Sequence, residues 1–427
     1  MEVKKVYQNI YVKPVDLTKN KIKIFNKHFF TDLDEFKMYW QLCEDDKIIQ
    51  EGVDDKLNLE PRNEKVLILP IKKYIRKNTS EYFLNFSFKL KERRSWVDKD
   101  YEVAAEQIQL SSLKEKVKVD LQKFPELTVN ETSENISIHG NGFEVIFEKK
   151  NGIISDYKYK NVRLLENGLQ PNFWRAPTDN DFGNGMDKRC AVWRYAGDNK
   201  QLKNITFEKL KTSIKVKVEY WMNDVEGKYF LTYTIYSNGV IKTEINFNAT
   251  KKDLPEIPRI GMKLQIPKEF SNVEWFGRGP QENYVDRFTS AFVGKYNSSV
   301  KEMFTNYVSH QENGTRTEIR WIALSNELGT GLMFVGEPLV SASTLYYTDE
   351  DLTQKKRGTM YPTDLIERNF VAVNIDYKQM GVGGDDSWGA HPHDQYKIFP
   401  KEYSYKFIMR PFEKKDDLML LSKQIYN

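Results

Sequence analysis

The 427-residue sequence is poor in the residues that build disulfide scaffolds and histidine-based catalytic sites. It has two cysteines, Cys43 and Cys190, and five histidines. Two cysteines exclude a disulfide-rich scaffold and a zinc site built from cysteines; two buried free thiols are the simplest interpretation, and one isolated disulfide is the alternative. Five scattered histidines give no catalytic triad by their order along the chain.

Long apolar runs and an excess of one charge are also absent. No segment approaches the ~18 apolar residues that a membrane-spanning helix requires, and residues 1–5 are too charged for a secretory signal. The 65 Lys and Arg residues nearly balance 61 Asp and Glu residues, which gives a net charge of +4. Because nucleic-acid binding needs a strong basic surface, we predict neither a nucleic-acid nor a membrane partner.

Aromatic residues are abundant, at 13% of the chain, and they alternate with polar residues as in half-buried strands. This alternation occurs over residues 36–42 and 82–90 and recurs over 143–147, 214–220 and 229–235. The pattern predicts an all-β protein with an immunoglobulin-like sandwich over 1–110, a connector over 111–125, and a large antiparallel sandwich over 126–427. An Asn-Gly pair at Asn151 and Gly152 predicts a hairpin, and short helices are expected over 299–307 and near 418–425.

Four segments of the second half have the composition of site-forming loops. They span residues 172–183, 277–287, 311–316 and 381–389, and each combines glycine with charged or amide side chains. For most of these charged residues we favour ion pairs that hold the loops in place, such as Asp286 with Arg287 and Arg175 with Asp181.

Trp388 stands apart from those charged residues because no helical or strand period would bury it. An exposed indole can pack on the C–H face of a sugar while nearby carboxylates accept hydroxyl protons, and burial under the loop is the alternative of equal weight. A metal site formed by His391 and His393 beside Asp385 and Asp386 is disfavoured, because Pro392 restricts the histidines and no zinc motif has this spacing. We therefore assign no metal, and we leave the roles of the two histidines open.

At these loops the chain resembles the C-terminal part of the large multidomain β-galactosidases, whose last domain is called the β-galactosidase small chain. The resemblance rests on five motifs in order: 174–181 (WRAPTDND), 258–261 (PRIG), 277–287 (GRGPQENYVDR), 312–314 (ENG) and 383–388 (GGDDSW). Residues 1–110 look like the sandwich that follows the catalytic barrel in that family. His310 departs from the family pattern, in which proline often precedes the Gln-Glu-Asn-Gly stretch.

The resemblance implies a mutarotase-like supersandwich for the last domain and a substrate-stacking role for Trp388. Asp385, Asp386 and Ser387 match the same motif, and we expect them to position its loop. In the family, both catalytic glutamates and the magnesium and sodium sites belong to the barrel. Since retaining hydrolysis needs two carboxylates, we expect that this chain has no catalytic residue or cofactor of its own and does not hydrolyse a glycoside alone.

The expected partners are a β-galactoside sugar and the N-terminal catalytic domains or large subunit of the same enzyme. A fragment of one long polypeptide is favoured over a natural small subunit. A homo-oligomer is left open, and so is the compartment, with the cytoplasm favoured over the periplasm. Two other functions are left open: a mutarotase or epimerase, with His310 and Glu282 as the nearest acid–base candidates, and a carbohydrate-binding module.

Overall fold

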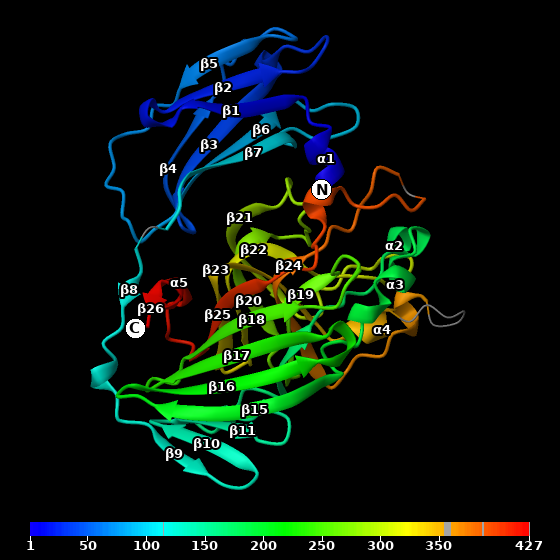
Figure 1. Ribbon diagram of the computed structural model, residues 1–427. Coiled ribbons are helices and arrows are strands. Elements are labelled where there is room, and N and C mark those ends of the chain that lie inside the picture. The colour runs from blue at the N-terminus through cyan, green and yellow to red at the C-terminus, as the bar shows by residue number, and fades with distance from the viewer. Residues whose placement is uncertain (114, 354–359, 387, 427) are drawn as a thin grey trace. The chain divides into compact units, whose positions relative to one another are not determined.

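The computed structural model describes residues 1–113, 115–353, 360–386 and 388–426, which form two compact units (Figure 1). Unit 1 comprises Met1–Lys118 together with Lys423–Ile425, and unit 2 comprises Val119–Ser422 and Tyr426. The division between Lys118 and Val119 falls within the segment 111–125 that the sequence predicts as a connector. Within the described ranges the five α-helices have at most five residues each, and none is long and apolar enough to span a membrane. The all-β prediction is therefore confirmed.

Unit 1 is a sandwich of two antiparallel sheets that share one hydrophobic core. The sheet orders are β1-β2-β5 and β4-β3-β6-β7. The predicted alternation is confirmed, because every second residue from Phe36 to Leu42 and from Leu84 to Leu90 is buried in this core. The elements are α1 (Glu2–Val6), β1 (Ile10–Asp16), β2 (Lys21–Asn26), β3 (Phe36–Glu44), β4 (Lys47–Asp54), β5 (Glu64–Ile68), β6 (Tyr82–Leu90), β7 (Glu102–Ser111), β8 (Val117–Lys118) and β26 (Gln424–Ile425).

The last strand of the chain belongs to unit 1. β26 pairs in parallel with β8, and the preceding residue, Lys423, is buried with its ammonium group against Asp45 and 3.3 Å from the Ser80 hydroxyl. Sequence reasoning predicted neither the strand nor this ion pair.

Unit 2 is a larger antiparallel sandwich. A 12-stranded sheet follows the path β14-β19-β24-β23-β25-β18-β17-β16-β15, with β20, β21 and β22 attached beside β23, and a five-stranded sheet has the order β13-β12-β11-β10-β9. One core joins the two sheets; for example, the rings of Phe147 and Tyr233 lie 5.3 Å apart. The predicted large sandwich is thus confirmed.

The strands of unit 2 are β9 (Thr128–Glu131), β10 (Asn135–Gly140), β11 (Phe143–Glu148), β12 (Ile153–Tyr159), β13 (Val162–Arg163), β14 (Asn167–Asn172), β15 (Lys200–Lys209), β16 (Ser213–Met222), β17 (Gly227–Tyr236), β18 (Ile241–Ala249), β19 (Arg259–Pro267), β20 (Asn272–Gly279), β21 (Phe292–Ser299), β22 (Arg316–Ser325), β23 (Gly331–Leu345), β24 (Phe370–Gln379) and β25 (Tyr403–Phe412). Its helices are α2 (Asp179–Gly183), α3 (Met186–Arg189), α4 (Asp349–Thr353) and α5 (Leu418–Ser422).

The local predictions had mixed outcomes. The Asn151–Gly152 hairpin is confirmed between β11 and β12. The helix expected near 418–425 is confirmed over 418–422 by α5, whereas Gln424 and Ile425 belong to β26. The helix expected over 299–307 is wrong: reciprocal bonds between Ser299 and Glu302 begin a single turn after β21, but Asn313 then accepts the Thr305 N–H, which a continuing helix would direct to the Lys301 carbonyl. The bond to Asn313 replaces a backbone bond that would continue the helix.

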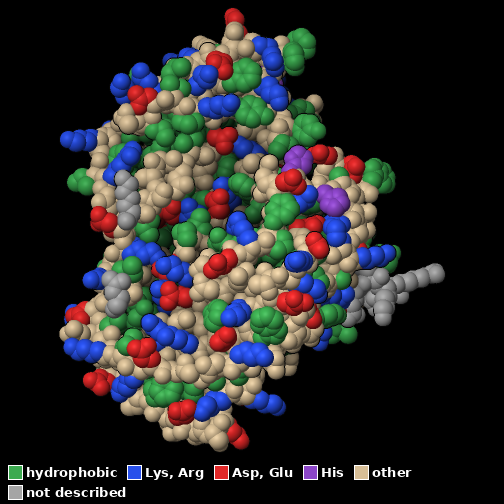
Figure 2. Space-filling view, viewed as in Figure 1, with side chains coloured by type: hydrophobic (Ala, Val, Ile, Leu, Met, Phe, Trp, Pro, Cys, Tyr) green, Lys and Arg blue, Asp and Glu red, His purple; other side chains and the backbone are tan. Residues whose placement is uncertain are grey.

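Charged side chains of both signs are interspersed over the visible face of each unit (Figure 2). This distribution agrees with the nearly neutral composition and provides no broad basic patch on that face.

Candidate functional site

The four loops predicted from composition lie together in unit 2, and each contacts two of the others. Segment 172–183 binds 381–389 through Arg175 Nη2 and the Gly381 carbonyl (2.9 Å), and it binds 311–316 through the Asp179 N–H and Gln311 Oε1 (3.2 Å). Segment 277–287 contacts 311–316 and 381–389 through further hydrogen bonds to backbone N–H groups. We call residues 172–183, 277–287, 311–316 and 381–389 the four-loop cluster.

Ion pairs inside the cluster fix its loops, as predicted for most of the charged residues. Arg175 and Asp181 are 0% and 1% exposed, and two bonds of 2.5 and 3.1 Å join them. Asp181 also accepts the N–H and hydroxyl of Thr178, which caps α2. This pair is confirmed as structural.

The predicted ion pair between Asp286 and Arg287 is wrong. Arg287 pairs with Glu282 at 3.0 Å, whereas Asp286 Oδ2 accepts the Gly383 N–H at 2.8 Å. Reciprocal backbone hydrogen bonds between Tyr284 and Arg287 close a tight turn here, and the two neighbouring side chains leave that turn toward different loops.

A buried charge network supports the cluster, and sequence reasoning assigned it no role. The Arg259 guanidinium, which is 0% exposed, binds Asp349 at 2.9 and 3.0 Å, Glu312 at 3.2 Å and Asp376 at 3.2 Å. Burial raises the pKa of Asp376 to about 8 despite the opposing effect of Arg259, and burial also raises the pKa of Glu312. Gly261 makes room for Asp376, because a Cβ there would lie 2.0 Å from Asp376 Oδ1. The alternation of β24 places Asp376 on the face of Asn374, opposite the core residues Val371, Val373 and Ile375, so the strand pattern signals neither the burial of this carboxylate nor its partners.

Trp388 is exposed on a loop whose base is fixed. Its side chain is 87% exposed, which agrees with the sugar-stacking interpretation and not with burial. Asp386 Oδ1 accepts the N–H groups of Trp388 (2.9 Å) and Ala390 (3.0 Å), and these bonds lower the pKa of Asp386. The side-chain amide of Asn180 bonds both the Gly389 N–H and the Ala390 carbonyl.

Close backbone packing adds to these bonds. Gly389 has φ +116°, and a Cβ at this position would lie 2.4 Å from the carbonyl carbon of Gly183. Only glycine fits this left-handed, crowded position. The loop that carries Trp388 is thereby held directly against α2.

The other predicted site residues have different surroundings. Asp385 Oδ1 lies 2.8 Å from His393 Nε2 at the surface, His391 is exposed, and Ser387 lies outside the described residues. The substrate-stacking role of Trp388 and the positioning roles of Asp385, Asp386 and Ser387 stay predictions.

The acid–base pair considered for a mutarotase does not form. His310 is 1% exposed, and its Nδ1 lies 3.0 Å from the Leu352 carbonyl. The Glu282 carboxylate binds Arg287, the Tyr307 hydroxyl and the Gly314 N–H. Neither group is free to exchange a proton with a bound sugar.

Known proteins similar to this chain are β-galactosidases. Residues 22–111 match the family model described as β-galactosidase, domain 4. The β-galactosidase of Priestia megaterium is 35% identical over 412 residues, which cover 96% of this chain and 39% of the relative. That of Psychromonas ingrahamii is 31% identical over 425 residues, covering 96% of this chain and 40% of the relative. The chain thus spans about two fifths of the length of these relatives.

Among solved structures, the galactose 1-epimerase of Lactobacillus acidophilus NCFM aligns with 67% of this chain and 98% of that chain, at 7% identity and a TM-score of 0.40. The family model described as β-galactosidase small chain matches residues 139–409, which contain the entire four-loop cluster. On this match over more than half of its length, the chain belongs to the β-galactosidase small chain family.

Proposed function

We propose that this chain is the non-catalytic C-terminal portion of a β-galactosidase, an enzyme that hydrolyses terminal β-D-galactosides. Its Trp388 loop contributes a stacking surface to an active site whose catalytic acids lie on the N-terminal domains or large subunit of the same enzyme. The observation that carries this proposal is an indole that is 87% exposed on a loop whose backbone is held by hydrogen bonds to the side chains of Asn180 and Asp386. An exposed indole gains nothing from the core, whereas a fixed one offers a flat apolar face to a ligand at low entropic cost.

The contacts of the carboxylates in the four-loop cluster indicate that these groups order the loops and do not take part in catalysis. Glycoside hydrolysis with retention needs two carboxyl groups about 5 Å apart, facing the scissile bond. Here Asp181 and Glu312 bind arginines, and Asp286 and Asp386 accept backbone N–H groups. Carboxylates held in this way order loops and are not available to attack a sugar or to protonate its leaving group.

The magnesium and sodium ions expected from the resemblance are assigned to the catalytic barrel. Within the described ranges of this chain, no three His, Cys, Asp or Glu side chains gather in a way that could hold a metal ion.

An activity measurement tests the division of labour. The chain alone is incubated with an aryl β-galactoside, and the same assay is repeated after coexpression with the N-terminal catalytic portion of the enzyme. We expect hydrolysis only in the second case. Hydrolysis of the aryl β-galactoside by the chain alone would contradict the proposal.

The stacking role is tested by Trp388→Ala in the complete enzyme. Aromatic contacts contribute about 0.5–1.5 kcal/mol, so we expect a two- to tenfold weaker binding of substrate or acceptor sugar, with partial rescue in Trp388→Phe. Trp96, which is 67% exposed in unit 1, provides the matched control Trp96→Ala. Unchanged kinetics in Trp388→Ala would remove the assigned role.

A further inference from the structure

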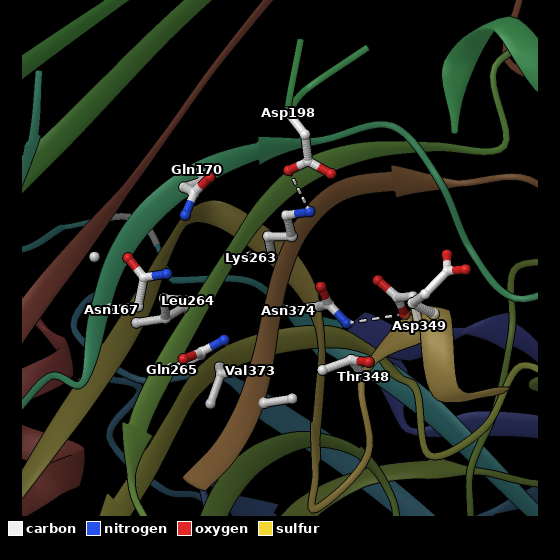
Figure 3. A pocket seen from close by; sticks show the side chains of 13 residues that line it. Asn167, Gln170, Asp198, Lys263, Leu264, Gln265, Thr348, Asp349, Val373 and Asn374 are labelled. Carbon is white, nitrogen blue, oxygen red and sulfur yellow. Dashed lines mark hydrogen bonds and ion pairs between the residues drawn. The ribbon is translucent and has the colours of Figure 1, made fainter. Parts of the chain in front are cut away.

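Unit 2 contains a cavity that none of the four loops lines. It has a volume of about 310 Å³ and lies on β14, β19 and β24, with Asp198 and residues 348–350 forming its sides. Figure 3 shows side chains from these three strands directed into one space, with Asp198 at one border and Asp349 at another. We call this the amide cavity, and its volume is in the range of small-ligand sites.

The strand register places its polar side chains in two rows. Asn167, Gln265 and Ala372 are cross-strand neighbours in one row. Gln170, Lys263 and Asn374 form the next row (Figure 3). A bulge between Asn167 and Gln170 brings both onto the same face, although they are three residues apart. The sheet thus presents four amides on one surface.

Two of these amides have no hydrogen-bond partner among the described residues. The side chains of Asn167 and Gln265 form no hydrogen bond within the described part of the chain, and both are half-buried. Asn374, in contrast, is fixed by Asn172, Ser343 and Asp349. Each free amide offers two N–H donors and one carbonyl acceptor.

An ordinary solvent-exposed sheet face would also carry polar residues, but no neighbouring segments would enclose it. Here residues 348–350 lie beside Asn374 of β24 at one border, and Asp198 lies at another border beside Lys263 (Figure 3). Ala372 lines the cavity at the end of the row that begins at Asn167, and its side chain is small. A walled space with unpaired donors and acceptors is typical of a ligand site rather than of bulk surface.

The charges around the amide cavity select against a charged ligand. Lys263 pairs with Asp198 at 2.7 Å, Glu350 pairs with Arg194, and Asp349 belongs to the Arg259 network. Because each lining charge already has a counter-ion, an ionic ligand would gain no new partner and would lose its hydration. A neutral molecule whose groups both donate and accept matches the amides best.

We propose that the amide cavity binds a neutral pyranose, as a free monosaccharide or as one unit of an oligosaccharide, through hydrogen bonds to Asn167 and Gln265. This binding is independent of Trp388 and of the function proposed above. The lining within the described ranges contains no aromatic ring, so hydrogen bonds supply the affinity. Because these bonds replace hydrogen bonds to water, their net contribution is small, and we expect a millimolar dissociation constant.

The test is a ligand-observed NMR titration of the full 427-residue chain carrying Trp388→Ala, which removes the stacking surface. The ligands are methyl β-D-galactoside, methyl β-D-glucoside, the anion galacturonate and the acyclic polyol glycerol. We expect saturable binding of at least one neutral glycoside, with galacturonate and glycerol binding more than tenfold more weakly.

Two independent changes then probe the cavity in that background. Asn167→Ala with Gln265→Ala removes the free amides, and Ala372→Leu fills the space without removing any. Each should weaken binding about tenfold or more, while Asn246→Ala, an exposed amide on β18 outside the cavity, should not. Thermal melting shows which variants are folded. One folded cavity variant, either the double alanine variant or Ala372→Leu, is enough to test the proposal. No saturable binding, equal binding of glycerol, or binding unchanged in a folded cavity variant would overturn the proposal and leave the role of Trp388 untouched.

Discussion

Replacing Arg259 by methionine removes the guanidinium that contacts Asp349, Glu312 and Asp376 in the charge network. The methionine side chain keeps much of the volume of arginine but leaves these three carboxyl groups without their counter-ion. Lys268→Met is the matched control, because Lys268 follows the end of the same strand, β19, and pairs with Glu367 at 3.1 Å near the surface.

The expected losses differ because burial differs. Removing one partner of a buried ion pair costs about 3–5 kcal/mol, since the remaining charge stays buried and uncompensated. Arg259 is 0% exposed and has contacts of 2.9–3.2 Å to three carboxylates, so we expect a loss of about 4 kcal/mol. Lys268 and Glu367 have side chains that are 43% and 39% exposed, and solvent screening limits such a pair to at most about 1 kcal/mol.

Urea unfolding, followed by tryptophan fluorescence at several pH values, measures both losses. Carboxyl groups left without Arg259 can escape the buried charge by taking up protons, so the loss in Arg259→Met should be smaller near pH 5 than near pH 8. The Lys268→Met loss should change little over this range. A loss in Arg259→Met within about 1 kcal/mol of the control at pH 8 would refute the reasoning that this network stabilises unit 2.

Three further predictions follow from buried groups. Burial raises the pKa of Asp376 from 3.8 to about 8, so the folded state retains a proton that the unfolded state releases; the free energy of unfolding should fall as pH rises from about 4 to 8, and Asp376→Asn should flatten this slope in pH-dependent urea unfolding. Lys423→Met leaves the buried Asp45 unpaired and should cost unit 1 about 3 kcal/mol in thermal unfolding, and no change would mean that this ion pair is only peripheral. Cys43 and Cys190 are free and buried, and burial raises the pKa of each thiol to about 11 and about 12; both should react with a thiol reagent only at the rate of unfolding, and fast labelling of the native chain would contradict this.

The strands could be predicted because their signal is local. Alternation over 36–42 and 214–220 reflects a sheet with one face toward a core, and each strand carries that pattern in its own residues. The Asn151–Gly152 hairpin is local in the same way. The expected helix over 299–307 failed because the backbone N–H and carbonyl of Thr305 bind the Asn313 side chain, and a pattern of apolar spacing does not record such side-chain competition.

The loops could be identified from composition, but their assembly could not. Glycine beside charged and amide residues marks 172–183 and 381–389 as irregular, yet nothing in either segment states that Asn180 binds the backbone of Gly389 and Ala390. Their contact depends on the paths of β14 and β24 through a 12-stranded sheet. The same holds for Arg259, whose three carboxylate partners lie between 53 and 117 positions away along the chain.

The buried ion pair of Arg175 and Asp181 lies at the start of the loop that carries the exposed Trp388 indole, and this position gives the pair a role beyond stability. Well-packed apolar side chains often stabilise a protein as much as buried ion pairs do, but ion pairs restrict geometry because each donor needs an acceptor in one direction. Arg175 binds Asp181 within α2 and also the carbonyl of Gly381, at the start of the loop that carries Trp388. A shift of that loop would therefore leave a guanidinium partly unpaired in a buried place. The cost of leaving this charge unpaired therefore resists movement of the loop, and the stacking role that we propose for Trp388 would depend on that resistance more than on additional stability.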